Sequence, residues 1–244
     1  MFERLKQLTK FNPSIGFSKK PNDSVFADIM GHDDLKKYLL DNMIHEKNIN
    51  ILLNGKPHTA KTAILKCMEK HYGSRAVFID CSSTTTKAGI RDRLYPVRNK
   101  VKYILLDELS RLKPFDQGIL LNLLQHGRIT STLSKGNKDF TINALKVFAT
   151  SNDYYKIIPP LRDRFDTFNM HKYNLDEFIA VGTFCIRKED KRIPDDVIEY
   201  MLEQTYTQLN TTNIRLVLNG MRTIRSIEDV DKWINLKQMY KMDD

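Results

Sequence analysis

The chain has 244 residues but only three cysteines, and no apolar run approaches the roughly 18 residues that a membrane-spanning helix needs. Cys67, Cys81 and Cys185 are too few and too scattered for a disulfide framework, and no Cys-x-x-Cys pair indicates a zinc site. The first residues carry charges but no long apolar segment, so no signal peptide is expected. We therefore expect a cytoplasmic protein with reduced thiols and no membrane partner.

Acidic residues are also fewer than basic residues. Asp and Glu total 30 against 39 Lys and Arg, which gives a net charge of +9. A basic balance attracts polyanions such as nucleic acid. Part of the excess lies in residues 1–22, which we expect to form a basic N-terminal tail, and part lies in residues 87–102. A solvated surface explains the same charge, so a nucleic-acid partner is plausible but not required.

Short, continuous apolar stretches alternate with helical patterns over most of the chain. Such stretches are typical of strands buried on both faces of a parallel sheet. They lie at residues 49–53, 76–79, 103–106, 147–149 and 165–170, and the first is preceded by a helical pattern at residues 33–45. The alternation predicts an α/β fold with a five-stranded parallel sheet.

From about residue 173 only helical patterns remain. They lie at residues 176–186, 194–204, 213–222 and 227–240. The expected organisation is therefore an α/β domain over residues 23–171 and a small all-α domain over residues 172–244.

One loop has the residues of a phosphate-binding site. It lies between the first expected strand and a helical pattern, and it reads Gly55-Lys56-Pro57-His58-Thr59-Ala60-Lys61-Thr62-Ala63. Such a loop turns its backbone N–H groups toward phosphate oxygens. Lys61 is placed to reach the β- and γ-phosphates, and the Thr62 hydroxyl is placed to bind Mg²⁺. Ala60 stands where a second glycine is usual, which the loop tolerates if the φ of Ala60 is negative.

Polar residues that suit ATP hydrolysis lie next to three of the later apolar stretches. Asp107 ends one stretch and is placed to hold Mg²⁺, and Glu108 is placed to polarise the attacking water as a base. Asn152 follows the next stretch, where it can hydrogen-bond that water or the γ-phosphate. Arg162 and Arg164 precede the last stretch, and an arginine at a subunit edge can stabilise charge on a neighbour's γ-phosphate.

In order and spacing, these motifs resemble the AAA+ ATPase superfamily over about residues 23–225. The resemblance implies a P-loop AAA+ core followed by a small helical lid, ATP and Mg²⁺ as cofactors, and self-assembly into a hexameric or similar ring. The matching motifs are Phe26–His32 on the adenine side, Gly55–Thr62 as Walker A, Leu105–Glu108 as Walker B, and Thr150–Asn152 as sensor 1.

The resemblance also assigns roles to single residues. Ile29 and Met30 would contact the nucleotide from the adenine side, and Arg215, which opens a lid helix as sensor 2 does, would contact a phosphate in cis. Arg164 matches the arginine finger that acts in trans, with Arg162 as the alternative.

Residues 127–143 resemble the hairpin before sensor 1 that marks the RuvB-like, MCM and MoxR-like branches. Apolar residues alternate on both arms, and a Gly-Asn pair lies in the turn. Lys135 and Lys138 are expected at its tip. Archaeal RuvB-like ATPases are the closest match, although too few residues follow Arg225 for the winged-helix domain of RuvB.

Three functions are compatible with these motifs. The first is an ATPase that remodels or translocates nucleic acid, which the net charge and the hairpin lysines favour. The second is a MoxR-like protein-remodelling or chaperone ATPase, for which Tyr95 is the candidate aromatic residue of a pore loop. The third is a slow nucleotide-dependent assembly switch, and Glu108 argues against it because a pure switch can do without the base.

Overall fold

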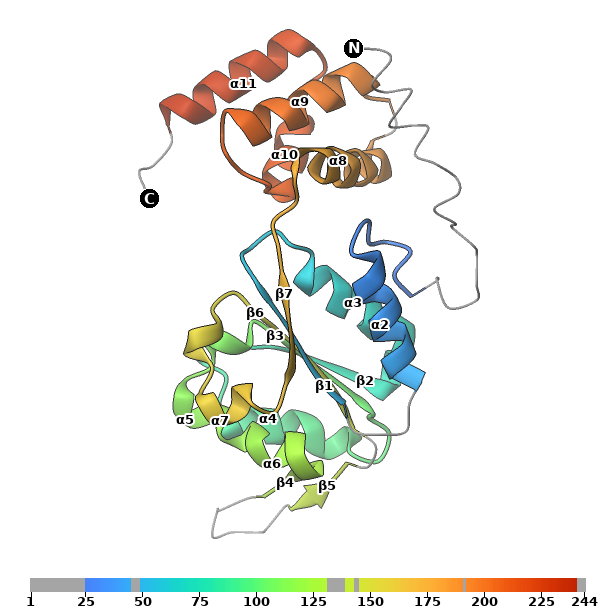
Figure 1. Cartoon of the computed structure of the whole chain (residues 1–244), viewed down its shortest axis with the longest axis vertical. Coiled ribbons are helices and arrows are strands. Elements are labelled where there is room, and N and C mark those ends of the chain that lie inside the picture. Colours follow the sequence, from blue (N-terminus) through green and yellow to red (C-terminus); the bar gives the residue numbers. More distant parts are fainter. Residues whose placement is uncertain (1–24, 45–48, 131–138, 143–144, 191, 241–244) are drawn as a thin grey trace.

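The computed structural model describes residues 25–44, 49–130, 139–142, 145–190 and 192–240 (Figure 1). At its centre is a sheet with strand order β2-β3-β6-β1-β7, in which every neighbouring pair is parallel. The predicted five-stranded parallel sheet is therefore confirmed. Its strands are β1 (Ile49–Gly55), β2 (Ala76–Asp80), β3 (Tyr103–Asp107), β6 (Lys146–Ser151) and β7 (Asp166–Met170).

Two of the three inner strands, β3 and β6, are buried at every residue. Alternate side chains of a strand point to opposite faces, so Ile104 and Leu106 pack into one apolar cluster and Tyr103 and Leu105 into another. Helices cover both faces, which explains why the strands are apolar without alternation. The covering helices are α4 (Lys87–Leu94) and α6 (Ile119–His126) on the first face, and α2 (Asp33–Ile44) and α3 (Lys61–Tyr72) on the second.

Short helices connect these elements. They are η1 (Gly73–Arg75), η2 (Tyr95–Val97), η3 (Leu109–Arg111), α5 (Pro114–Gln117), η4 (Tyr154–Lys156) and α7 (Pro159–Arg162). Gln117 ties two of these regions together, because its amide donates to the Lys156 carbonyl oxygen at 3.0 Å and accepts from the Ile158 N–H at 2.8 Å.

Four helices follow β7 and gather at one end of the molecule (Figure 1). They enclose a third apolar cluster, in which Phe178, Leu202 and Val217 are fully buried. The first of them begins after Asn174, whose side chain forms a reciprocal capping box with Glu177. The helices are α8 (Leu175–Glu189), α9 (Asp195–Thr207), α10 (Ile214–Met221) and α11 (Ile227–Met239).

A short antiparallel pair, β4 (Arg128–Ile129) and β5 (Phe140–Thr141), follows α6. It lies where the base of the predicted hairpin is expected. At Gly127 φ is 65°, and a Cβ there would lie 2.2 Å from the Ile142 carbonyl oxygen, so only glycine fits. The predicted hairpin tip, with Lys135 and Lys138, lies outside the described residues, as does the predicted tail at residues 1–22.

Candidate nucleotide-binding site

A cleft of about 280 Å³ lies at the carboxyl ends of the strands, beside the loop that follows β1 and helices α8 and α10. Ligands of open α/β sheets commonly bind at this edge. The cleft brings together most of the predicted site: residues 57–63 of the loop, Glu108, Asn152, Ile29, Met30 and Arg215. Gly55, Lys56 and Asp107 are not part of its lining, but each contacts a residue that is.

The loop is held close to β7. A Cβ on Gly55 would lie 2.5 Å from the Met170 carbonyl oxygen, so the start of the loop requires glycine. Two later residues, His58 at φ 69° and Ala60 at φ 62°, adopt left-handed backbone. The negative φ that would let alanine replace glycine without strain is therefore absent at Ala60. For a residue with a Cβ the left-handed conformation costs roughly 1–2 kcal/mol.

The Lys61 side chain lies buried under the loop. Its ammonium donates to the carbonyl oxygens of Gly55 at 2.7 Å and Lys56 at 2.6 Å, and to the Thr59 hydroxyl at 3.0 Å. Burial lowers the pKa of Lys61 to about 8, while the negative charges of Asp107 and Glu108 act in the opposite direction. An anion in the cleft would supply the charge compensation that burial withholds, so the residue suits a phosphate.

Three oxygen-bearing side chains meet at the start of α3. The Thr62 hydroxyl donates to Asp107 Oδ1 at 2.9 Å, and the Thr150 hydroxyl donates to the same oxygen at 2.6 Å. Thr150 in turn accepts the backbone N–H of Glu108 at 2.8 Å. Mg²⁺ prefers oxygen ligands and often takes one or two carboxylates with phosphate oxygens, so the donor set of Thr62 and Asp107 fits it.

Glu108 stands at the end of β3 with a left-handed backbone, φ 54°. Its carboxylate accepts from Arg111 at 2.8 Å and from the Asn152 amide at 3.3 Å. The predicted base and the predicted sensor residue are thus neighbours. Sequence analysis missed Arg111, although a cation three residues after a carboxylate is a spacing at which ion pairs form readily.

The far end of the cleft is apolar. Ile29 and Met30 lie there with side chains that sequence analysis missed, namely Tyr173, Val181, Phe184 and Cys185. The last three recur at i, i+3 and i+4 on α8, a pattern that indicates one helix face but not what that face covers. Tyr173 is 4% exposed, its hydroxyl has no hydrogen-bond partner among the described residues, and burial raises its pKa to about 12.

The two predicted arginine-finger candidates lie outside this cleft. Arg164 donates to Gln125 of α6 at 3.0 Å and to the Pro160 carbonyl oxygen. The guanidinium of Arg162 stacks over Tyr154, 5.0 Å from the ring centre. Neither side chain lines the cleft of its own chain.

The sequence over residues 51–173, half of the chain, matches the model of the AAA family, the ATPase family associated with various cellular activities. The chain belongs to the AAA family of ATPases. This ATPase hydrolyses ATP and uses it together with Mg²⁺. Within the described ranges, no helix of the AAA chain is both long and apolar enough to cross a lipid bilayer.

Two curated relatives are Lon proteases. Lon protease of Fusobacterium nucleatum is 23% identical over 259 residues, which cover 90% of this chain and 34% of that protein. Lon protease homolog 2, peroxisomal, of Caenorhabditis elegans is 24% identical over 176 residues, which cover 61% of this chain and 23% of that protein. This chain thus spans about a third or less of the length of these relatives.

Solved structures of Thermotoga maritima RuvB share the fold. One mutant superposes with a TM-score of 0.65 at 17% identity, covering 86% of this chain and 71% of that one. The structure described as the RuvB Holliday junction branch migration motor gives 0.63 at 15% identity, covering 85% and 70%. The predicted AAA+ core with a RuvB-like architecture is therefore confirmed as a fold.

Proposed function

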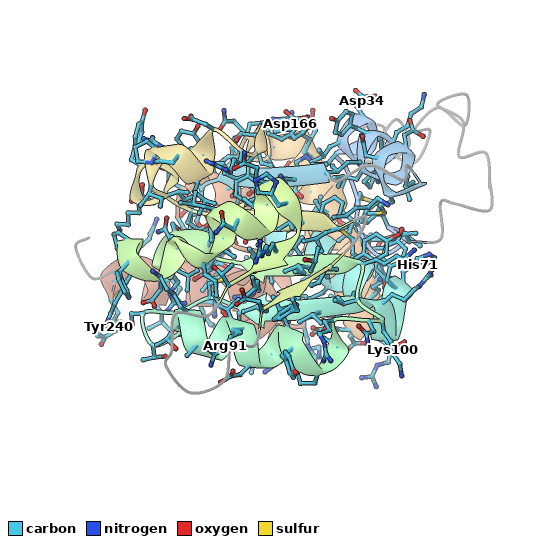
Figure 2. The ribbon with its side chains drawn as sticks, turned by 90° about the horizontal axis from the view of Figure 1, so that it is seen from below. Asp34, His71, Arg91, Lys100, Asp166 and Tyr240 are labelled. Atoms are coloured by element: carbon cyan, nitrogen blue, oxygen red, sulfur yellow. The ribbon has the colours of Figure 1, made fainter. Side chains whose placement is uncertain are left out.

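We propose that this AAA ATPase assembles into a ring and uses ATP hydrolysis to remodel or translocate nucleic acid. The observation that carries the proposal is a basic surface formed by residues 87–102, which begin with α4 and follow β2 in the chain. In Figure 2, Arg91 and Lys100 lie along one side of the molecule, and Asp34 and Asp166 lie along the opposite side. The excess of Lys and Arg in residues 87–102 would attract a polyanion to this side. Within residues 87–102 the exposed cations include Arg93, Lys100 and Lys102.

The described base of the hairpin supports the same proposal. It follows α6 directly, and α6 also carries Gln125, the hydrogen-bond partner of Arg164. Because the hairpin follows α6 and Arg164 contacts α6 through Gln125, a movement of Arg164 when a neighbouring subunit hydrolyses ATP would be passed to the hairpin through this helix. A substrate contact would then be coupled to the nucleotide state.

We also propose roles for the residues of the cleft. ATP would supply the bond that is hydrolysed. Mg²⁺ would neutralise part of the negative charge that develops on the phosphate oxygens. Lys61 and the backbone N–H groups of the loop hold the β- and γ-phosphates. Thr62 and Asp107 hold Mg²⁺ through oxygen atoms. Glu108 accepts a proton from the attacking water, and Asn152 orients Glu108 or that water.

Two arginines are assigned to opposite sides of a subunit interface. Arg215 lines the cleft from α10 and would contact a phosphate in cis. Arg164 lies outside its own cleft and would reach the phosphate of a neighbouring copy, with Arg162 as the alternative. This assignment requires a ring, because each active site would be completed by the next subunit.

The division of the chain remains part of the proposal. Residues 23–171 would form the α/β nucleotide-binding domain and residues 172–244 the lid, preceded by a basic tail at residues 1–22. The separate apolar cluster of the four C-terminal helices supports a distinct lid. Lys188 of α8 pairs with Asp28, which lines the cleft, so nucleotide binding and lid position would be linked.

A protein-remodelling ATPase is the second candidate, and two observations favour it. The curated relatives are proteases, and Phe115 and Tyr155 are 77% and 85% exposed. Tyr95 supports it poorly, because its ring packs against Phe140 with 5.7 Å between ring centres. A slow assembly switch is the third candidate, and the base Glu108 argues against it.

Steady-state ATP hydrolysis with and without DNA separates the candidates. We expect duplex, single-stranded or four-way-junction DNA to stimulate hydrolysis, with stimulation that fades as salt rises. Glu108→Gln provides the background rate. Robust hydrolysis that no DNA changes would favour a protein substrate, and a very slow rate under all conditions would favour the switch.

A matched pair of variants tests the basic surface itself. Reversing the charge of Arg93, Lys100 and Lys102 to Glu should abolish the stimulation and flatten the salt dependence of DNA binding. The control reverses three other exposed lysines, Lys37, Lys66 and Lys232, and changes the net charge equally. If both triple variants lose stimulation alike, the net charge and not this surface binds DNA.

A further inference from the structure

The side chain of His58 has no role in the chemistry described above. His58 belongs to the phosphate-binding loop and lines the cleft, and its backbone φ is 69°. Glycine adopts this backbone most readily, and histidine adopts it more often than most other residues. The loop therefore carries an imidazole at a position where backbone conformation alone would favour having no side chain.

Positive charge converges on this imidazole from three elements. Partial burial lowers the pKa of His58, and the charges of Arg215 on α10, Lys61 in the loop and Lys172 between β7 and α8 lower it further. Lys172 and Arg215 are exposed, and the His58 ring has no hydrogen bond to any other residue that the structure describes. Such a group of cations is stabilised when an anion with several charges enters it.

The carboxylates at the cleft have partners of their own, and Asp28, which lines it, pairs with Lys188. Glu108 lines the same cleft but accepts from Arg111 and Asn152. Asp107 accepts from Thr62 and Thr150. Lys56, also in the loop, is exposed and adds positive charge. Asp107 and Glu108 already offset part of the positive charge at Lys61, and a bound anion with several charges would add to this compensation at His58, Arg215 and Lys172.

We propose that the His58 imidazole contacts the terminal phosphates of the bound nucleotide and that, with Arg215 and Lys172, it favours a nucleoside triphosphate over a diphosphate. The inference rests on the nucleotide site proposed above. It adds a side-chain contact to a loop that otherwise acts through backbone N–H groups and Lys61.

The proposed contact would couple nucleotide binding to protonation of the His58 imidazole. With no ligand, the imidazole is neutral at neutral pH because its pKa is below the usual value. Phosphate charge favours the protonated form, so triphosphate binding takes up a proton. Affinity for the triphosphate then rises as the pH falls through the range in which the bound imidazole protonates, and affinity for the diphosphate rises less.

Calorimetry on the full chain tests this with Mg²⁺ and a non-hydrolysable ATP analogue, and separately with ADP, in two buffers of different ionisation enthalpy. Wild type should take up a proton with the analogue. His58→Gly, which also relieves the left-handed backbone, and His58→Asn, which tolerates it, should lose that uptake and bind the analogue about tenfold more weakly near pH 6. Because a terminal phosphate titrates in the same range, the quantity compared is the difference between wild type and variant.

A matched control separates the His58 imidazole from the general effect of removing a histidine. His71→Asn changes an exposed histidine on α3 and should behave as wild type. In the wild-type chain, NMR titration of His58 should show its pKa rising when the analogue binds.

Unchanged proton uptake in both His58 variants, or an NMR titration of His58 that the analogue does not shift, would overturn the inference while leaving the nucleotide site in place. Failure of wild type to bind the analogue at all would instead refute the site.

Discussion

The two ends of the nucleotide cleft are built differently. At the phosphate end, Thr62 and Thr150 donate to Asp107 at 2.9 and 2.6 Å, and Lys61 donates to Thr59 at 3.0 Å. At the other end, Ile29, Tyr173 and the α8 side chains offer apolar surface without such a network. Directional bonds need particular side chains at particular positions, whereas apolar contact needs only shape and area. Substitutions should therefore be far less tolerated at the phosphate end, and the following predictions test that difference.

The largest effect is expected at the arginine that would complete the phosphate end from a neighbouring subunit. Arg164→Ala should lower kcat about 10³-fold with little change in nucleotide affinity, because an arginine finger acts on charge that develops in the transition state. Mixing the variant with wild type should give rates that deviate from the wild-type fraction. Rates strictly proportional to that fraction would remove the trans role, and a stronger effect of Arg162→Ala would transfer it to that residue.

Glu108→Gln should lower kcat by about 10²–10³-fold, since an amide cannot accept the proton of the attacking water. Affinity for ATP should remain within a few-fold of wild type, which fluorescence binding with a labelled nucleotide would measure. Arg111→Ala is the companion variant, because it removes a partner of the carboxylate but keeps the base. A normal turnover of Glu108→Gln would place the base elsewhere.

Lys61→Ala should weaken binding of ATP and ADP by about 10²-fold, because the loop loses the cation that would hold the phosphates. Lys56→Ala is the matched control, since it removes a loop lysine whose side chain does not line the cleft. Equal losses in the two variants, measured by equilibrium binding, would mean that general positive charge and not Lys61 holds the phosphates.

At the apolar end, Phe184→Ala should weaken ATP and ADP binding alike, by about fivefold, because part of the apolar contact surface is lost. Phe115→Ala removes a phenylalanine that lies outside the cleft and should leave affinity unchanged. A loss at Phe184 as large as that of Lys61→Ala would contradict the difference between the two ends.

The smallest effect concerns the backbone of the loop. Ala60→Gly should raise the free energy of unfolding by about 0.5–1 kcal/mol, because glycine adopts the left-handed conformation without strain. Ala63→Gly, inside α3, should lower it by up to about 1 kcal/mol, because glycine disfavours helix. Thermal unfolding would show whether the two variants change the free energy of unfolding in opposite directions. A change in the same direction for both would contradict backbone strain at Ala60.

The predictions from sequence agree most closely with the structure where the functional residues lie close together along the chain. The strand before Gly55, the helix after Lys61 and the carboxylates of Asp107 and Glu108 were all predictable, because continuous apolar strands and a phosphate-binding loop have characteristic local patterns. The backbone of His58 and Ala60 was not predictable in this way. Left-handed backbone at residues other than glycine is imposed by the path of the loop between β1 and α3 and not by the residues themselves.

Contacts between distant segments were the other part that patterns did not reveal. Tyr173 and Phe184 follow the phosphate-binding loop by more than a hundred residues, and nothing in the α8 pattern states what its apolar face covers. The Asn152 amide on Glu108 and the Gln125 contact of Arg164 likewise join different strands and helices. Each depends on how the elements pack.

The sequence by itself determined the fold class and the family, and it predicted a phosphate-binding loop, because strand periodicity and short motifs are local properties of the chain. Only the tertiary structure decided which side chains line the apolar end, how Glu108 is held and that His58 lies among Arg215, Lys61 and Lys172. These are relations across the sheet and between the sheet and the C-terminal helices. They arise from packing and from charges close in space, which the order of residues does not state.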